Sequence, residues 1–179
     1  MKHFYLIGYF KFLILLLPCF NTFADEKLLA NEGYVVINII VKDALPQSVK
    51  IKSRNFLGEN YTKSDLKVGE NFELIKLPEG EYYWSRLNLK NGRYFDLEDN
   101  NFTLKVIAGK INYSGHLLVD VNSKFSTGSF DYVNRSSVVI EQLESCCSEL
   151  LNSITLIYTG RSVDPFIEFF QRISNEKGG

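Results

Sequence analysis

The sequence predicts a mainly β protein: an antiparallel β-sandwich of about seven strands, followed by a C-terminal helical segment. Residues 33–133 contain short runs of strand length, several of them alternating apolar and polar, with Gly, Pro or Asn between them. After residue 134 the apolar residues recur at helical spacing instead. Residues 1–24 have the composition of an export signal, so we expect the folded part to start later.

The first 24 residues have the layout of a secretory signal peptide. Lys11 precedes an unbroken apolar run that Pro18 ends, and small residues lead to Ala24, where we expect cleavage. Lys11 interrupts the apolar stretch too early for a membrane span of roughly 20 residues. Acylation of Cys19 would make a lipoprotein, but Pro18 stands where such signals need a small residue. We therefore expect a periplasmic or secreted protein that does not span a membrane.

Residues 25–179 remain after cleavage and fit one ordinary domain, with a flexible lead-in at 25–32. Hydrophobic residues make up 45% of the chain and aromatic residues 14%, which is enough for a packed core. Basic and acidic residues are interspersed, and no segment is strongly basic. We therefore expect no nucleic-acid partner, and no residue pattern indicates a cofactor.

The first half of the β region predicts three strands. Residues 34–41 are rich in β-branched side chains, which is typical of a buried strand that ends before Pro46. Residues 48–53 alternate apolar residues with lysine, as a half-buried strand does. Residues 72–77 alternate again, and a Pro-Glu-Gly turn at 78–80 follows them.

The second half of the β region predicts further strands joined by short turns. Asn91-Gly92 is a two-residue hairpin signal between a strand at 81–89 and one at 93–97. Three more runs of strand length follow, at residues 102–106, 111–121 and 130–133.

The C-terminal segment, residues 134–179, predicts two helices packed on the sandwich. Ser136 or Ser137 is placed to cap the first helix. Its apolar positions are Val139, Leu143, Cys146, Cys147, Leu150, Leu151 and Ile154. The β-branched stretch 154–158 could instead leave the helix as a strand. Asp164-Pro165 then starts a second helix, because Asp caps free amides and Pro fits the first turn.

The second helix carries an apolar stripe at helical spacing. The stripe consists of Phe166, Phe169, Phe170 and Ile173. Such a stripe needs a surface to cover it, and two answers remain open: the sheet of the same chain, or a partner protein.

Cys146 and Cys147 are the only cysteines after residue 24, and they are adjacent. Side chains of neighbouring helical residues point about 100° apart, so a bond between them is disfavoured. We therefore expect two small, buried apolar residues on a helix. A bridge to a second chain and a redox role are the alternatives.

Two phrases carry a resemblance to known families. Residues 77–84, LPEGEYYW, resemble the L-P-x-G-x-Y turn and strand of prealbumin-like and carboxypeptidase-regulatory-like β-sandwich modules. Residues 102–115, FTLKVIAGKINYSG, are similar to a stretch of uncharacterised exported bacterial proteins with such sandwiches. The resemblance implies a scaffold used for binding or assembly and brings no catalytic residues. We therefore expect a non-enzymatic binding or structural module of the bacterial cell envelope, with an envelope protein or a glycan as its partner.

A carbohydrate- or peptide-binding function is the alternative, with an exposed row of side chains on the strands around Asn91-Gly92. The candidate ligand-binding residues are Tyr82, Trp84, Arg86 and Tyr94. Strict alternation puts Tyr82 and Trp84 on one face, so one set of rings faces outward unless a bulge intervenes. Packing in the core or at a sheet edge is the competing interpretation of these rings.

No catalytic or metal-binding set is expected. His116 is the only histidine after residue 24, and no base and nucleophile accompany it at a suitable spacing. A hydrolase using His116 with Ser114 or Asp120 would need long-range partners. The carboxylates within 96–99 match no EF-hand spacing, so we expect a solvated turn there rather than a calcium loop.

Overall fold

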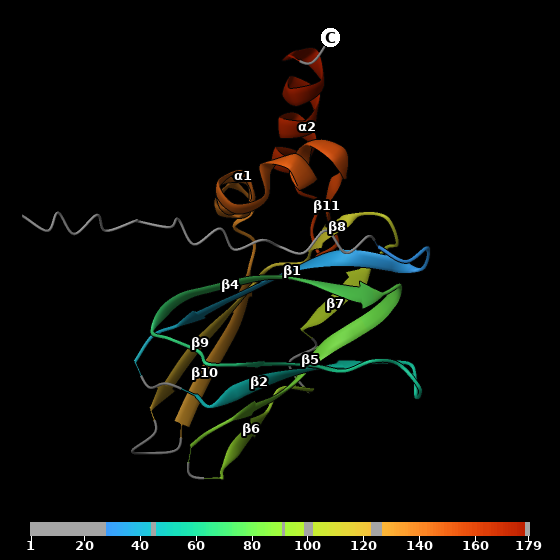
Figure 1. Ribbon diagram of the computed structural model, residues 1–179. Helices are drawn as coiled ribbons and strands as arrows, with labels where there is room; N and C mark the ends of the chain where they lie inside the picture. The colour runs from blue at the N-terminus through green and yellow to red at the C-terminus, as the bar shows by residue number, and fades with distance from the viewer. Residues whose placement is uncertain (1–27, 44–45, 91, 99–101, 123–126, 178–179) are drawn as a thin grey trace, which may run out of the picture.

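The computed structural model describes residues 28–43, 46–90, 92–98, 102–122 and 127–177. The predicted signal peptide, with its cleavage site and Cys19, lies outside the described residues. The described part is mainly β, with two sheets and a helical C-terminal segment (Figure 1). None of the helices in the described ranges is long and apolar enough to cross a membrane.

Sheet A has six strands, and β1 lies at its centre. β1 pairs with β4 antiparallel along one edge, and with β8 and β9 in parallel along the other. β9 pairs with β10, and β8 with β11. The strands are β1 (Glu32–Val41), β4 (Gly69–Pro78), β8 (Ile111–Tyr113), β9 (His116–Asn122), β10 (Thr127–Val133) and β11 (Leu156–Tyr158).

Sheet B has five strands and is antiparallel throughout. β5 lies at its centre, with β2 on one edge and both β6 and β7 on the other. β3 extends the sheet beyond β2. The strands are β2 (Ser48–Ser53), β3 (Tyr61–Ser64), β5 (Gly80–Asn88), β6 (Tyr94–Asp96) and β7 (Thr103–Val106).

Two expectations about the strands need correction. The described part of the predicted sandwich region holds ten strands, β1–β10, rather than about seven, partly because the predicted strand 111–121 divides into β8 and β9. Gly115 sits at this division with φ +139°, and a Cβ there would meet the Tyr132 ring at 3.0 Å. Sheet A is also mixed rather than antiparallel, because β1 pairs in parallel with β8 and β9.

The continuous apolar run of β1 is explained by burial on both of its faces. Val35 and Ile37 point into a core cluster that also contains Val49 and Trp84 of sheet B. Val36 points the other way, into a second cluster beneath the C-terminal helices. Side chains of both sheets therefore meet in one core, and the opposite face of sheet A is covered by the C-terminal segment.

The C-terminal segment consists of α1 (Ser136–Ser153), β11 and α2 (Pro165–Lys177). α1 covers sheet A through Val139, Ile140 and Leu143, and the extended option for residues 154–158 is confirmed by β11. The predicted start of α2 is confirmed, because the amide of Phe166 donates to Oδ1 of Asp164 at 3.0 Å.

The apolar stripe of α2 divides between the core and the surface. Figure 1 shows α2 projecting from α1, away from the two sheets. Phe170 packs against the second core cluster, and Ile167, which is not in the predicted stripe, is buried there. Phe166 and Phe169 are 43% and 48% exposed. The same chain therefore covers only part of the stripe, and Phe166 and Phe169 remain open to solvent.

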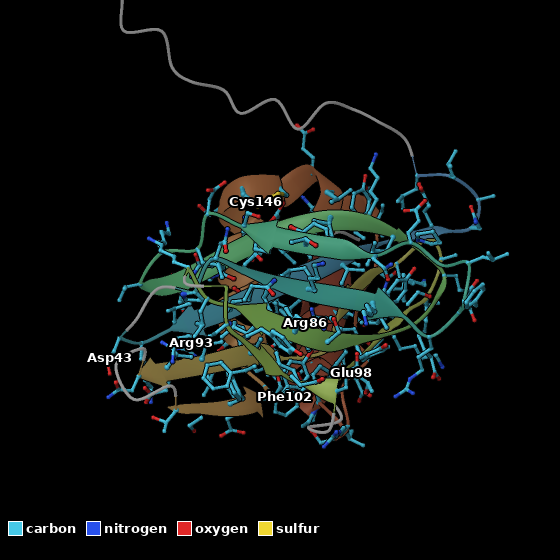
Figure 2. All side chains as sticks on the ribbon, turned by 90° about the horizontal axis from the view of Figure 1, so that it is seen from below. Asp43, Arg86, Arg93, Glu98, Phe102 and Cys146 are labelled. Atoms are coloured by element: carbon cyan, nitrogen blue, oxygen red, sulfur yellow. A yellow bond between two sulfur atoms is a disulfide. The ribbon has the colours of Figure 1, made fainter. Side chains whose placement is uncertain are left out.

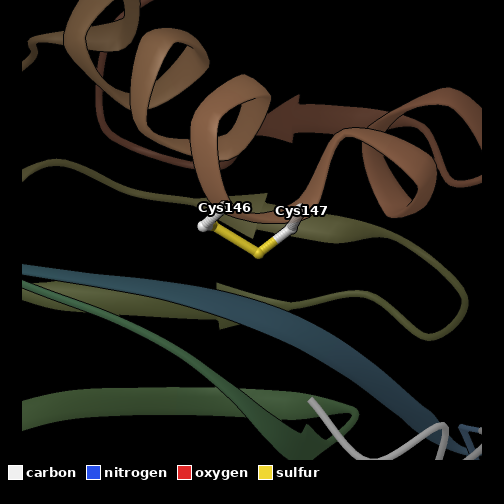
Figure 3. The surroundings of a disulfide bond; sticks show 2 residues. All are labelled: Cys146 and Cys147. Atoms are coloured by element: carbon white, nitrogen blue, oxygen red, sulfur yellow. A yellow bond between two sulfur atoms is a disulfide. The ribbon is translucent and has the colours of Figure 1, made fainter. Parts of the chain in front are cut away.

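The expectation for the cysteines was wrong, because Cys146 and Cys147 form a disulfide bond with each other. Cys146 is exposed and Cys147 is half-buried. The bond is accommodated because the backbone of Cys147 leaves the helical region, with φ −149° and ψ 40°. Figure 3 shows the disulfide where the α1 ribbon is interrupted between two helical pieces.

Candidate functional site

A β-bulge in β5 decides which of its side chains face outward. Lys50 of β2 pairs with Arg86, but the next residue, Ile51, pairs with Trp84, so Ser85 is the extra residue. Ser85 is buried, and its hydroxyl donates to the carbonyl of Lys50 at 3.4 Å. The bulge reverses the alternation, so Trp84 points into the core while Arg86 points to the outer face of sheet B.

The structure corrects the expected exposed row, because Tyr82 and Trp84 belong to the core. Trp84 is 0% exposed and Tyr82 2%, and both lie in the cluster that the two sheets share. The Tyr82 hydroxyl donates to the carbonyl of Pro78 at 2.9 Å, so it has a partner within the fold. Packing in the core, the competing interpretation, therefore describes these two rings.

Arg86 and Tyr94, the other two candidates, do come together on the outer face. The Arg86 guanidinium carbon lies 4.0 Å from the centre of the Tyr94 ring, and the ring is 53% exposed. Their strands are adjacent, since Asn88 of β5 is the register partner of Tyr94 in β6. Figure 2 views the molecule from the side opposite the helices and labels Arg86 there.

A second cation–aromatic pair lies on β5 and the end of β2, and the sequence did not single it out. The Arg54 guanidinium carbon is 5.6 Å from the centre of the Tyr83 ring. Arg86 was the signal that could have revealed Tyr83. Strict alternation places Arg86 on the same face as Tyr82 and Trp84, and a guanidinium is not expected in a core. A bulge that turns Arg86 outward leaves Tyr82 and Trp84 facing the core and Tyr83 facing solvent. We call the surface formed by Arg54, Tyr83, Arg86 and Tyr94 the β5 face.

Two shallow depressions border the β5 face. One of about 360 Å³ is lined by Ser53, Arg54, Tyr83 and Glu98. The other, of about 330 Å³, is lined by Leu89, Gly92, Arg93, Tyr94 and Phe95. Both are open to solvent, so this surface is suited to holding an extended ligand against the sheet rather than enclosing a small molecule.

The charges on the β5 face are partly paired. Lys52 lies 3.2 Å from Glu98, and Arg54 lies 3.7 Å from Glu81. These pairs are well exposed, so each contributes little to stability. Among the described residues Arg86 has no ion pair, and its guanidinium carbon lies over the Tyr94 ring.

His116 lies on the other side of the molecule, beneath α1, and is fully buried. Burial lowers the pKa of His116 to about 4, and the charge of Arg135 adds to this effect. The Ser114 hydroxyl is 2.7 Å from that of Thr159, and the Asp120 carboxylate is 3.7 Å from the Lys42 amine. Each candidate partner of His116 is thus engaged elsewhere.

No metal centre is evident in the described part of the chain, where no group of three or more His, Cys, Asp or Glu side chains could hold an ion. In the predicted solvated turn, Oδ1 of Asp96 accepts the amide of Glu98 at 2.9 Å, and Glu98 pairs with Lys52. Both carboxylates are therefore used locally.

Comparisons of this chain with protein-family models, with curated proteins and with solved structures give no significant match.

Proposed function

We propose that this protein is a non-enzymatic binding or structural module that is exported to the bacterial cell envelope. In this proposal residues 1–24 are removed on export, and residues 33–133 form a β-sandwich of the prealbumin-like kind. The resemblance of residues 77–84 and 102–115 to such modules supports the proposal. So does the core that the side chains of both sheets share.

The observation that carries the proposal is the β5 face. It is a solvent-facing sheet surface on which Arg86 and Arg54 lie over the Tyr94 and Tyr83 rings. Aromatic and arginine side chains are enriched in the parts of protein surfaces that bind partners.

The proposal is tested by affinity capture from a bacterial envelope extract, with the protein as bait. We expect a specific envelope component to be retained, and the double substitution Arg86→Ala/Tyr94→Ala to abolish its retention. Lys42→Ala is the matched control, because Lys42 forms an exposed ion pair with Asp120 in sheet A. Retention that is equal for all three proteins would rule out the β5 face as the binding surface.

A second candidate function is binding of carbohydrate through the same face. It is favoured by the exposed Tyr94 ring, because sugar rings stack on aromatic side chains while arginine N–H groups donate to their oxygens. Titration with neutral and uronic-acid oligosaccharides, followed by calorimetry, tests this function. We expect the acidic sugars to bind more tightly, since Arg86 has no carboxylate partner among the described residues. A peptide ligand is favoured if no sugar binds but an envelope protein is captured.

A further inference from the structure

The two residues joined by the Cys146–Cys147 disulfide differ in their exposure to solvent. Cys146 is exposed together with Ser145 and Ser148, whereas Cys147 packs against the second core cluster. We therefore expect an external thiol to attack Sγ of Cys146. Attack on that sulfur makes Sγ of Cys147 the leaving group.

The disulfide and the continuity of α1 exclude each other. Adjacent side chains on an α-helix diverge by about 100°, so the two sulfurs meet only where the backbone leaves the helical region. The structure shows this departure at Cys147, with helix on both sides of it. Breaking the bond removes the covalent reason for the kink, and the flanking segments can then join as one helix.

The helix that carries the disulfide is acidic. α1 contains Glu141, Glu144 and Glu149 and no lysine or arginine. Arg135, just before the helix, lies 2.8 Å from Glu70 of β4, so its charge is already compensated. An approaching thiol with negative charge is therefore repelled, and one with positive charge is attracted.

We propose that Cys146–Cys147 is a thiol–disulfide exchange site that is reduced by a positively charged partner dithiol, and that its reduction joins α1 into one continuous helix. This inference does not depend on the function proposed for the β5 face. The partner class is a dithiol oxidoreductase with basic residues around its active thiols, because such a surface complements the acidic helix.

The exchange balances as a two-electron reaction. A partner thiolate attacks Sγ of Cys146 and forms a mixed disulfide, while the Cys146–Cys147 bond breaks and Sγ of Cys147 leaves and takes up a proton. The second thiol of the partner then attacks the partner sulfur of the mixed disulfide and releases Cys146 as a thiol. Two electrons and two protons pass to the cysteine pair, and the partner becomes a disulfide.

Reduction has a structural consequence beyond the two cysteines. The first half of α1 is buried on sheet A through Val139 and Leu143, while the second half packs against the same cluster through the partly buried Leu150 and Leu151 and leads to β11 and α2. Straightening the kink at Cys147 therefore changes the position of the second half relative to the sheet. The exposed Phe166 and Phe169 of α2 lie on the part of the chain that this change reaches.

The charge preference is tested with small thiols on the purified protein. We expect cysteamine, a cation, to reduce the disulfide about 3- to 10-fold faster than glutathione, an anion, at low salt. Both rates are divided by the rates of the same thiols with hydroxyethyl disulfide, a neutral reference. The ratio of the corrected cysteamine rate to the corrected glutathione rate should fall towards 1 in high salt. It should also fall in the double variant Glu144→Gln/Glu149→Gln. Glu98→Gln, on the side of the molecule opposite Cys146 (Figure 2), should leave it unchanged.

The coupling to the helix is tested by hydrogen exchange with and without dithiothreitol. We expect the amides of residues 147–151 to become roughly tenfold more protected on reduction. The variant Cys147→Ser should show the same protection without reductant, which separates the effect from the reagent. Equal protection in both redox forms would overturn the coupling. A ratio of cysteamine to glutathione rates at or below 1, or two free thiols in the air-purified protein, would overturn the exchange site.

Discussion

The hydroxyl of Tyr113 lies 2.8 Å from Nδ1 of His116 and 2.7 Å from the amide nitrogen of Arg135. The amide of Arg135 can only donate, so the hydroxyl accepts from it, while the direction of the hydrogen bond between the hydroxyl and Nδ1 depends on the imidazole tautomer. The imidazole is neutral near pH 7, because burial lowers the pKa of His116 to about 4. Through this chain, the junction between β8 and β9 is tied to the start of α1.

The buried His116 predicts an acid-sensitive stability. Burial lowers its pKa to about 4 from the ordinary 6.5, so between these values the unfolded chain binds more protons than the folded chain. The stability that depends on a neutral His116 is fully present above pH 6.5 and is lost as the pH falls to 4 and below. We expect the free energy of unfolding to decrease by up to about 3 kcal/mol across this window. Urea unfolding measured at pH 7, 5.5 and 4 tests this.

Asp and Glu residues also titrate near the lower end of this window, so a variant is needed to isolate the histidine. His116→Gln keeps a polar side chain but does not titrate between pH 4 and 6.5. Its stability should be lower at pH 7 and should depend less on pH. An unchanged pH dependence in this variant would show that His116 is not its source.

The tryptophan predicts a clear spectroscopic result. Trp84 is the only tryptophan of the chain, and it is fully buried between the sheets. We expect short-wavelength emission and weak quenching by acrylamide, and no change when a ligand binds to the β5 face. Trp84→Ala should destabilise the protein by about 3–5 kcal/mol, and Trp84→Phe by less, since part of the core volume is kept. Emission typical of a solvated indole would contradict this packing.

The pair of Arg86 and Tyr94 predicts a measurable coupling. A double-mutant cycle with Arg86→Ala and Tyr94→Ala should give an interaction energy of about 0.5–1 kcal/mol, as expected for an exposed cation–aromatic contact. Each single variant should stay folded, because neither side chain belongs to the core. A coupling energy of zero would mean that the guanidinium does not rest on the ring in solution.

Two neighbouring positions of α2 should respond differently to truncation. Ile167→Ala is expected to cost about 2–5 kcal/mol, because this side chain is buried in the cluster beneath the helices. Phe169→Ala should change stability by roughly 0.5 kcal/mol or less, since the ring is half exposed. Thermal unfolding of both variants compares them directly. Equal losses would mean that α2 packs through its predicted phenylalanine stripe after all.

Much of the fold was predictable because strands and helices have short periods that a linear sequence displays. The strand at 48–53, the strand on either side of Asn91-Gly92 and the start of α2 at Asp164-Pro165 all follow from local signals. The candidate site was predicted only in part. Arg86 and Tyr94 do meet, but the rule of strict alternation placed Trp84 with them.

The sequence by itself determined the mainly β composition, the turn positions and the change to helices near residue 134, since these depend on neighbouring residues. Only the tertiary structure decided the bulge at Ser85, the parallel pairing of β1 and the bond between Cys146 and Cys147. In each case local preference competes with packing. The bulge keeps the Arg86 charge out of the core, β1 pairs with strands on both of its edges, and α1 loses its regular helix at the disulfide. The bulge and the parallel pairing are settled by contacts between residues far apart in the chain, whereas the disulfide joins two neighbouring residues.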